Sequence, residues 1–467
     1  MPEPRSAADD DGTGPRPMVA PPANFAARRM LVSTIAITVA FAIGIATWQA
    51  FHDDGQWAHG AGADWTRLAV VDRTTGLVTY RDAEGAVIGS TDPVGRIDEV
   101  YTHDARLALI GPTEIVLQSG IEDPPTIIDI DRNATVTPFE TADSFHLVVG
   151  RATGGDVVIV DALTGDAVDV GNLTGQPDPL MFVGTIRQSA DGSAFAIADA
   201  AAFRTVVVRA DDVVPHYFGD QPLAVGPDRV VTSQLIDREA DVTISDLDRA
   251  PQGLGTVEIP AGAVLRGHDA IVVTTDGTVY RIANGKQAAQ RLGSLDVPGG
   301  GTVRWVRPSM DGERLVIGGD VFQAVIELDG TTVFTTTFDA PVDLPTPASD
   351  WTCLPTGADG VDRSIVSLDT GDILASLPGQ TVAATAADGC TVISERSGVF
   401  ELVTTEGTVR LGRLRSVALG PDGRSIVWTT PTGRTELVRV DGDLALSDPV
   451  ELVGAPRNLA VVFLLDR

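Results

Sequence analysis

The sequence predicts an all-β fold, a single β-propeller of seven to ten blades preceded by one transmembrane helix. Three observations lead to this prediction. Glycine (49) and proline (29) are frequent in a chain of 467 residues that is also rich in valine and threonine, a composition typical of many short strands joined by turns. One uncharged apolar run lies near the N-terminus. A pattern of two apolar runs and a tight turn then recurs about every 40 residues.

The first 64 residues are expected to form a tail, a membrane segment and a tether. Residues 1–29 are rich in Pro and Asp and lack apolar periodicity, which predicts a disordered tail. Residues 30–51 contain no charged residue and are long enough to cross a bilayer as a helix. Arg28 and Arg29 precede this run, so the positive-inside rule places the tail in the cytoplasm. Residues 52–64 then form a flexible linker, and residues 65–467 form an extracytoplasmic domain.

Two other interpretations of this segment remain open. A cleaved signal peptide would have a shorter apolar region and a small-residue cleavage site, whereas the sequence continues as "TWQAFHDD". The paired arginines also suit export by the twin-arginine route, so the sequence leaves the choice between the Sec and twin-arginine routes open. No cysteine lies near the segment, which argues against a lipoprotein.

The repeat defines the fold of residues 65–467. Clear copies are "RLAVVDRTTGLVTYRDAEGAVIG", "HLVVGRATGGDVVIVDALTGDAV", "RLVIGGDVFQAVIELDGTTVF" and "SIVWTTPTGRTELVRVDGD". The residue that ends the second run gives ten marks: Asp82, Asp131, Asp161, Ala210, Asp248, Asn284, Asp329, Asp369, Glu406 and Asp441. A period of about 40 residues built from strands alone predicts four-stranded propeller blades. Immunoglobulin-like sandwiches, the main alternative, need about 100 residues for each unit.

The two ends of the repeat region predict how the ring closes. The repeat begins at Trp65 with the second strand of a unit, and residues 458–467 form an apolar run in the position of a first strand. The last strand is therefore expected to complete the blade that Trp65 begins. This pairing would remove the two open sheet edges that an unclosed ring exposes.

Asp-Gly turns between strands indicate a family resemblance at the level of the fold. The stretches "ALGPDGRSIVW", "RPSMDGERLVIGG" and "RQSADGSAFAIAD" resemble the repeats of TolB-type and WD-repeat propellers. The resemblance covers the repeat region and rests on short motifs. The Trp-Asp dipeptide that gives WD repeats their name is absent, which argues against that family proper.

One stretch has the ligand spacing of a calcium loop. In Asp129–Glu140, acidic or amide residues fall at positions 1, 3 and 5, and Glu falls at position 12. Position 6 is Ala134, where the loop requires Gly, and flanking helices are missing. Asp131 is also one of the repeat marks, so we expect it to hold a turn, as Asp-Gly aspartates do. No metal site is predicted.

Two His-Asp pairs, His103-Asp104 and His268-Asp269, replace Asp-Gly at turns. Such a pair could orient an imidazole for base catalysis. No nucleophile motif, zinc-protease motif or phosphate-binding glycine loop accompanies them, so a turn role is expected and no catalytic residue is predicted. No cofactor is predicted either. A quinone dehydrogenase is disfavoured because the tryptophans do not recur at a fixed position in the repeat.

The two cysteines, Cys353 and Cys390, lie about one repeat apart. Residues one period apart in a ring occupy neighbouring blades at similar radius. Outside the membrane, a disulfide between adjacent blades is therefore the expected use of the pair. Two unpaired, buried thiols are the alternative.

Charge and the lack of a catalytic motif together favour a binding role. The net charge of −30 repels nucleic acid and anionic surfaces, so nucleic acid is not an expected partner. The sequence predicts a membrane-anchored binding or scaffold module for a cell-envelope protein or glycan. The alternative is an envelope-glycan hydrolase or lyase with its site at the mouth of the channel. The long irregular stretch Phe338–Gly360 is a candidate partner-facing loop.

Overall fold

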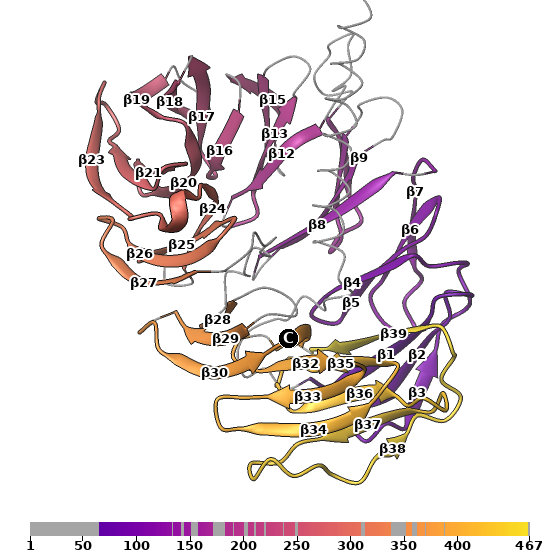
Figure 1. Ribbon diagram of the computed structural model, residues 1–467. Coiled ribbons are helices and arrows are strands. Elements are labelled where there is room, and N and C mark those ends of the chain that lie inside the picture. Colours follow the sequence, from indigo (N-terminus) through magenta and orange to yellow (C-terminus); the bar gives the residue numbers. More distant parts are fainter. Residues whose placement is uncertain are drawn as a thin grey trace, which may run out of the picture. The chain divides into compact units, whose positions relative to one another are not determined.

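Ten antiparallel sheets form a ten-bladed β-propeller. The computed structural model describes residues 65–132, 134–141, 144–150, 157–170, 183–189, 191–199, 204–209, 212–218, 221–236, 238–247, 251–309, 313–337, 352–356, 362–368, 370–386 and 388–465. Nine of the sheets in these residues have four strands and one has three (Figure 1). The prediction of a propeller is confirmed, and the blade number is ten, the number of repeat marks.

The first five blades follow one another along the chain, and each strand is hydrogen-bonded to the next. Blade 1 contains β39 (Leu459–Leu464), β1 (Arg67–Asp72), β2 (Val78–Asp82) and β3 (Val87–Ser90); blade 2 contains β4 (Glu99–His103), β5 (Arg106–Ile110), β6 (Glu114–Gln118) and β7 (Thr126–Asp129); blade 3 contains β8 (Thr135–Thr141), β9 (Ser144–Gly150), β10 (Val157–Asp161) and β11 (Ala167–Asp169); blade 4 contains β12 (Val183–Gln188), β13 (Ala194–Asp199), β14 (Arg204–Arg209) and β15 (Asp212–Phe218); blade 5 contains β16 (Gln221–Val225), β17 (Arg229–Ile236), β18 (Glu239–Asp246) and β19 (Pro251–Glu258).

The other five blades repeat this order, and a 3-10 turn, η1 (Pro298–Gly300), precedes the seventh. Blade 6 contains β20 (Pro260–Arg266), β21 (Asp269–Thr274), β22 (Thr278–Ile282) and β23 (Ala289–Ser294); blade 7 contains β24 (Val303–Pro308), β25 (Arg314–Gly319), β26 (Phe322–Glu327) and β27 (Thr332–Thr337); blade 8 contains β28 (Cys353–Thr356), β29 (Asp362–Ser367) and β30 (Ile373–Pro378); blade 9 contains β31 (Thr381–Thr385), β32 (Val392–Arg396), β33 (Val399–Val403) and β34 (Thr408–Arg413); blade 10 contains β35 (Ser416–Leu419), β36 (Ser425–Thr429), β37 (Thr435–Arg439) and β38 (Val450–Glu451).

The position of a strand within its blade explains its sequence. Second strands have both faces covered by neighbouring blades and read as nearly continuous apolar runs, as in β5 (RLALI) and β36 (SIVWT). Fourth strands are mostly exposed, as in β3 and β7. First strands are innermost, because β12, β16, β20 and β24 contact one another in succession. The fourth strands lie on the outside (Figure 1).

Each pair of consecutive blades shares an apolar core. Ten clusters of buried side chains occupy the ten interfaces, including the one between blades 10 and 1. In the core between blades 3 and 4, for example, Val148 of β9 packs with Phe195 of β13. Since a single blade cannot bury both of its faces, this unbroken series of interfaces stabilises the whole domain.

The last strand closes the propeller, as the sequence predicts. β39 pairs antiparallel with β1, with Leu68 opposite Phe463 and Val70 opposite Val461. The closing strand contributes to two cores at once. Val462 and Leu464 lie in the core between blades 1 and 2, whereas Phe463 packs against blade 10.

One repeat mark is in the wrong register. Asp131 lies between β7 and β8, in the connection from blade 2 to blade 3, and not after a third strand. The third strand of blade 2, β6, ends at Gln118 instead. The connection that follows is a longer loop, in which the Gln118 amide donates to the carbonyls of Gly120 and Asp123. No aspartate turn follows this strand, and the repeat mark is therefore assigned to Asp131, further along the chain.

Several predictions fall outside the described residues. These are the tail (residues 1–29), the transmembrane helix (residues 30–51), the linker (residues 52–64) and the marks Ala210, Asp248 and Asp369. Within the part of the chain that the structure describes, no helix is long and apolar enough to cross a membrane. The membrane anchor therefore stays a prediction.

Candidate functional site

Most turn aspartates accept hydrogen bonds from backbone N–H groups of their own turn. Asp191, Asp388 and Asp422 lie between first and second strands, and each accepts a hydrogen bond from the N–H two residues further along. Asp82 and Asp441 do the same after third strands. These are the aspartate turns that the sequence predicts. Their carboxylates are bound in the turns and are poorly placed to hold a ligand.

Asp422 also supports the closure between blades 10 and 1. Its carboxylate accepts hydrogen bonds from the N–H groups of Arg424 and Ser425 and from the Ser425 hydroxyl. Across the interface it accepts one from Trp65 Nε1 at 3.1 Å. The Trp65 ring lies edge-on to Phe463 at 5.1 Å between centroids. Trp65 is thus held by Asp422 of blade 10 and by Phe463 of the closing strand β39.

Asp422→Ala is expected to destabilise the domain more than Asp441→Ala. Both variants lose turn hydrogen bonds, but Asp441 bonds only to the N–H groups of Asp443 and Ala445. Asp422→Ala also leaves the buried Trp65 Nε1 without its acceptor, which costs about 1–3 kcal/mol. Urea denaturation of both variants measures the difference. Equal free energies of unfolding would show that the Trp65 contact contributes nothing to closure.

The stretch that resembles a calcium loop does not form one. Asp129 ends β7, whereas Glu140 lies near the end of β8 and binds His103. The Asp131 carbonyl accepts a hydrogen bond from the Ala134 N–H in a tight turn. Among the described residues, no group of three or more His, Cys, Asp or Glu side chains could hold a metal ion.

His103, at the end of β4, joins the innermost strands of blades 2 and 3. Its Nδ1 is hydrogen-bonded to Glu140 Oε1, and its Nε2 lies 3.8 Å from Asp104 Oδ2. The side chain is only 5% exposed and stacks on Phe145 at 5.7 Å between centroids. An imidazole enclosed by two carboxylates and a ring cannot reach a substrate in this conformation. The contact is therefore a link between blades.

The second His-Asp pair also occupies a turn. Arg229 Nη1 donates to His268 Nδ1 at 2.8 Å, which joins blade 5 to blade 6. Burial alone would raise the pKa of Asp269. Hydrogen bonds from the Asn284 N–H and the Arg281 guanidinium outweigh it and hold that pKa below its usual value. Neither His-Asp pair has a nucleophile in its described contacts.

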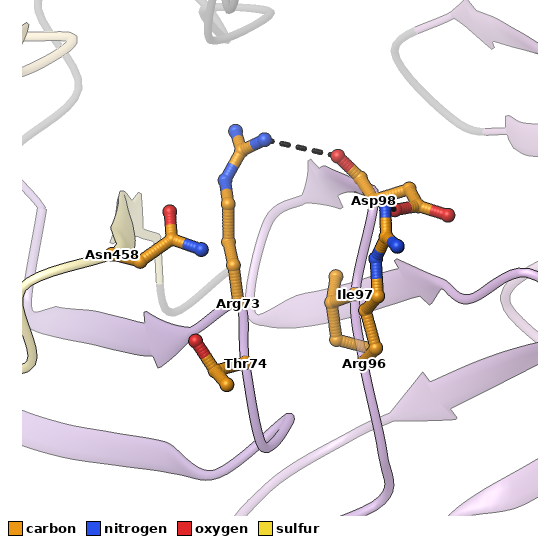
Figure 2. Close-up of a pocket in the computed structure, with 6 residues that line it drawn as sticks. All are labelled: Arg73, Thr74, Arg96, Ile97, Asp98 and Asn458. Carbon is orange, nitrogen blue, oxygen red and sulfur yellow. Dashed lines mark hydrogen bonds and ion pairs between the residues drawn. The ribbon is translucent and has the colours of Figure 1, made fainter.

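A cavity of about 450 Å³ lies where blade 1 meets blade 2. Its lining comes from the loop after β1, the loop before β4 and the residue before β39: Arg73, Thr74, Arg96, Ile97, Asp98 and Asn458 (Figure 2). Arg73 Nη1 donates to the Asp98 carbonyl at 2.9 Å, and Arg96 pairs with the Asp98 carboxylate at 2.7 Å. Both arginines are thus tied to Asp98.

The predicted disulfide is present. Cys353 of β28 and Cys390, before β32, are joined with their Cα atoms 4.9 Å apart. Cys353 packs with Ile365 and Val392 in the core between blades 8 and 9. The bond therefore links adjacent blades, as the spacing predicts. Of the candidate loop Phe338–Gly360, the structure describes only residues 352–356, most of which form β28.

Comparisons with known proteins find solved structures of low similarity. No protein-family profile matches the sequence, and neither does any curated protein. A crystal structure of a eukaryotic initiation factor is similar over 86% of this chain and 98% of its own, with 11% identity and a TM-score of 0.46. Apo AztD from Citrobacter koseri is similar over 85% and 98%, with 12% identity and a TM-score of 0.35. The dihydro-heme d1 dehydrogenase NirN is similar over 83% and 74%, with 15% identity and a TM-score of 0.36. These likenesses carry no argument about function.

Proposed function

We propose that the chain is a membrane-anchored, extracytoplasmic binding module that docks a partner of the cell envelope. The propeller provides a rigid support, since ten interblade cores and one disulfide hold it together. Residues 30–51 would fix it to the membrane. Several of its aspartates are engaged in turns, and exposed apolar side chains on the outer strands offer a contact area.

The observation that carries this proposal is an apolar patch on the outer strands beside the closure. The closure patch consists of Val87 and Ile88 of blade 1 and Val450 and Val453 of blade 10, all exposed, with Val453 74% exposed. The two blades touch here, because Arg81 Nη2 donates to the Val453 carbonyl at 2.6 Å. Exposed aliphatic groups that gather on one part of a soluble surface mark interaction sites.

A protein fits this patch better than a glycan. Valine and isoleucine side chains offer no hydrogen-bonding groups, and glycan recognition depends on such groups. Burial of aliphatic surface instead favours a partner with a complementary apolar face. The alternative function, an envelope-glycan hydrolase or lyase, would need an accessible acid or base. The buried His103 does not meet that need.

The test compares a patch variant with a matched surface variant. Val87→Asp combined with Val453→Asp is expected to abolish capture of the partner by the full chain from its own envelope. Ile373→Asp changes an equally apolar side chain, 66% exposed on β30 of blade 8, and should leave capture intact. Binding would move each introduced carboxylate from water into the apolar interface, which costs several kcal/mol.

Two results would contradict the proposal. One is that the parent and the double variant capture the same partner equally well. The other is turnover of an envelope glycan by the full chain with no partner recovered, which would favour the enzyme. Unfolding curves of both variants confirm that the domain stays folded.

A further inference from the structure

The sheet of blade 5 extends beyond the cover of the neighbouring blades. Its strands β17, β18 and β19 have eight residues each, and no other strand in the described residues has more than seven (Figure 1). The first five residues of β17 are buried, whereas Gln234, Leu235 and Ile236 at its end are exposed. The strands stay paired to this end, with Ile236 opposite Glu239 and Glu239 opposite Glu258. This end of blade 5 is therefore an exposed, hydrogen-bonded sheet.

One face of this sheet combines aliphatic and acidic side chains. Residues directly opposite each other in an antiparallel sheet share a face, and so do alternate residues of one strand. This face carries two exposed aliphatic side chains, Ile236 (51% exposed) and Leu254 (38% exposed), together with three carboxylates. We call this surface the blade 5 face, and its residues are Ile236, Glu239, Asp241, Leu254, Thr256 and Glu258.

Two carboxylates of the blade 5 face repel each other. Glu239 and Glu258 are directly opposite and both are exposed. Like charges in this arrangement destabilise a sheet. The hydrogen bonds at this face come from neutral hydroxyls, since Tyr280 donates to Glu258 at 2.6 Å and Thr256 donates to Asp241 at 2.7 Å. A positive group brought by a partner would relieve the repulsion.

Two cations of the chain lie close to this face in the fold but do not neutralise it. Arg238 precedes Glu239 in the sequence. Lys286 lies beside β19, because its carbonyl accepts a hydrogen bond from the Leu254 N–H at 3.1 Å. Both side chains are exposed, and within the part of the chain that the structure describes neither forms an ion pair. The negative charge of the face therefore remains available to a partner.

Charge and apolar surface together define the class of partner. A second copy of the chain, with a net charge of −30, would bring further negative charge to a negative face, and nucleic acids and anionic lipids would do the same. The two aliphatic side chains favour burial against apolar groups. A protein segment that carries Lys or Arg between aliphatic residues satisfies both conditions.

We propose that the blade 5 face docks a segment of a partner protein in which basic and aliphatic residues alternate. The basic side chains pair with Glu239 and Glu258, and the aliphatic side chains pack on Ile236 and Leu254. Because the pairing is electrostatic and exposed, binding weakens as the ionic strength rises. The closure patch belongs to blades 1 and 10, so this inference goes beyond the proposed function and does not depend on it.

Fluorescence anisotropy of a labelled peptide of alternating leucine and lysine, titrated with the purified full chain, tests the proposal. Glu239→Gln combined with Glu258→Gln should weaken binding at least about tenfold, because two ion pairs are lost. Ile236→Ser should weaken it at least about threefold, because it removes apolar contact area. Glu122→Gln combined with Glu406→Gln is the matched control. It removes the same charge from exposed residues of blades 2 and 9 and should bind like the parent.

Two further measurements separate binding from folding and from the closure patch. The variant with both Glu239→Gln and Glu258→Gln should unfold at the same or a higher urea concentration than the parent, because the repulsion between the two carboxylates is gone. Val87→Asp combined with Val453→Asp changes only the closure patch and should bind the peptide as the parent does. The blade 5 face and the proposed function can therefore fail separately.

Four results would overturn the blade 5 face as a docking site for a basic segment. The parent fails to bind the leucine–lysine peptide up to about 1 mM. The matched control loses as much affinity as the blade 5 variant, which shows general attraction to an acidic protein. A serine–lysine peptide binds as tightly, which shows that the aliphatic residues contribute nothing. The parent sediments as a dimer that Ile236→Ser dissociates, which makes a second copy the occupant.

Discussion

Deletion of Leu459–Leu465 is expected to abolish folding of the propeller. The deletion exposes the whole edge of β1 and removes the closing side chains from two cores. Loss of one buried leucine or phenylalanine costs about 2–5 kcal/mol, and several such losses exceed the 5–15 kcal/mol that holds a typical domain together. Limited proteolysis and near-ultraviolet circular dichroism of the full chain measure the effect.

A permuted chain provides the control. Placing Leu459–Leu465 and a short linker immediately before Trp65 would let the strand pair with β1 as a hairpin, as first and second strands do in the other blades. This variant should recover protease resistance and the native spectrum. If the simple deletion unfolds cooperatively at the same denaturant concentration as the parent, β39 does not close the propeller.

Replacement of both cysteines by alanine is the second change with a large expected effect. The bond spans 37 residues between blades 8 and 9. The chain-entropy model assigns about 4 kcal/mol to the closure of a loop of this length. Denaturant unfolding with and without reductant measures the loss. The parent in reductant should match the alanine variant, and a difference below about 1 kcal/mol between parent and variant under oxidising conditions would contradict this stabilisation.

Local patterns were sufficient to predict the blades, the closure and the disulfide. A third strand followed by an aspartate turn recurs because each blade meets the same neighbours, so one unit predicts the next. Asp82 and Asp441 fit this rule, and the structure confirms their turns. Asp131 does not fit, because blade 2 replaces the aspartate turn with a loop held by Gln118.

Contacts between blades could not be predicted from local patterns. His103 and Glu140 lie 37 residues apart and meet only because neighbouring innermost strands are side by side. Exposure of Val453 depends on which strand faces outward.

Electron cryomicroscopy of the full chain, viewed along the propeller axis, tests the central claim most directly. The account predicts one closed ring of ten blades, with the C-terminal strand in the same sheet as the strand that follows Trp65. A ring of fewer blades, two separate smaller propellers, or an open gap between the first and last blades would contradict it.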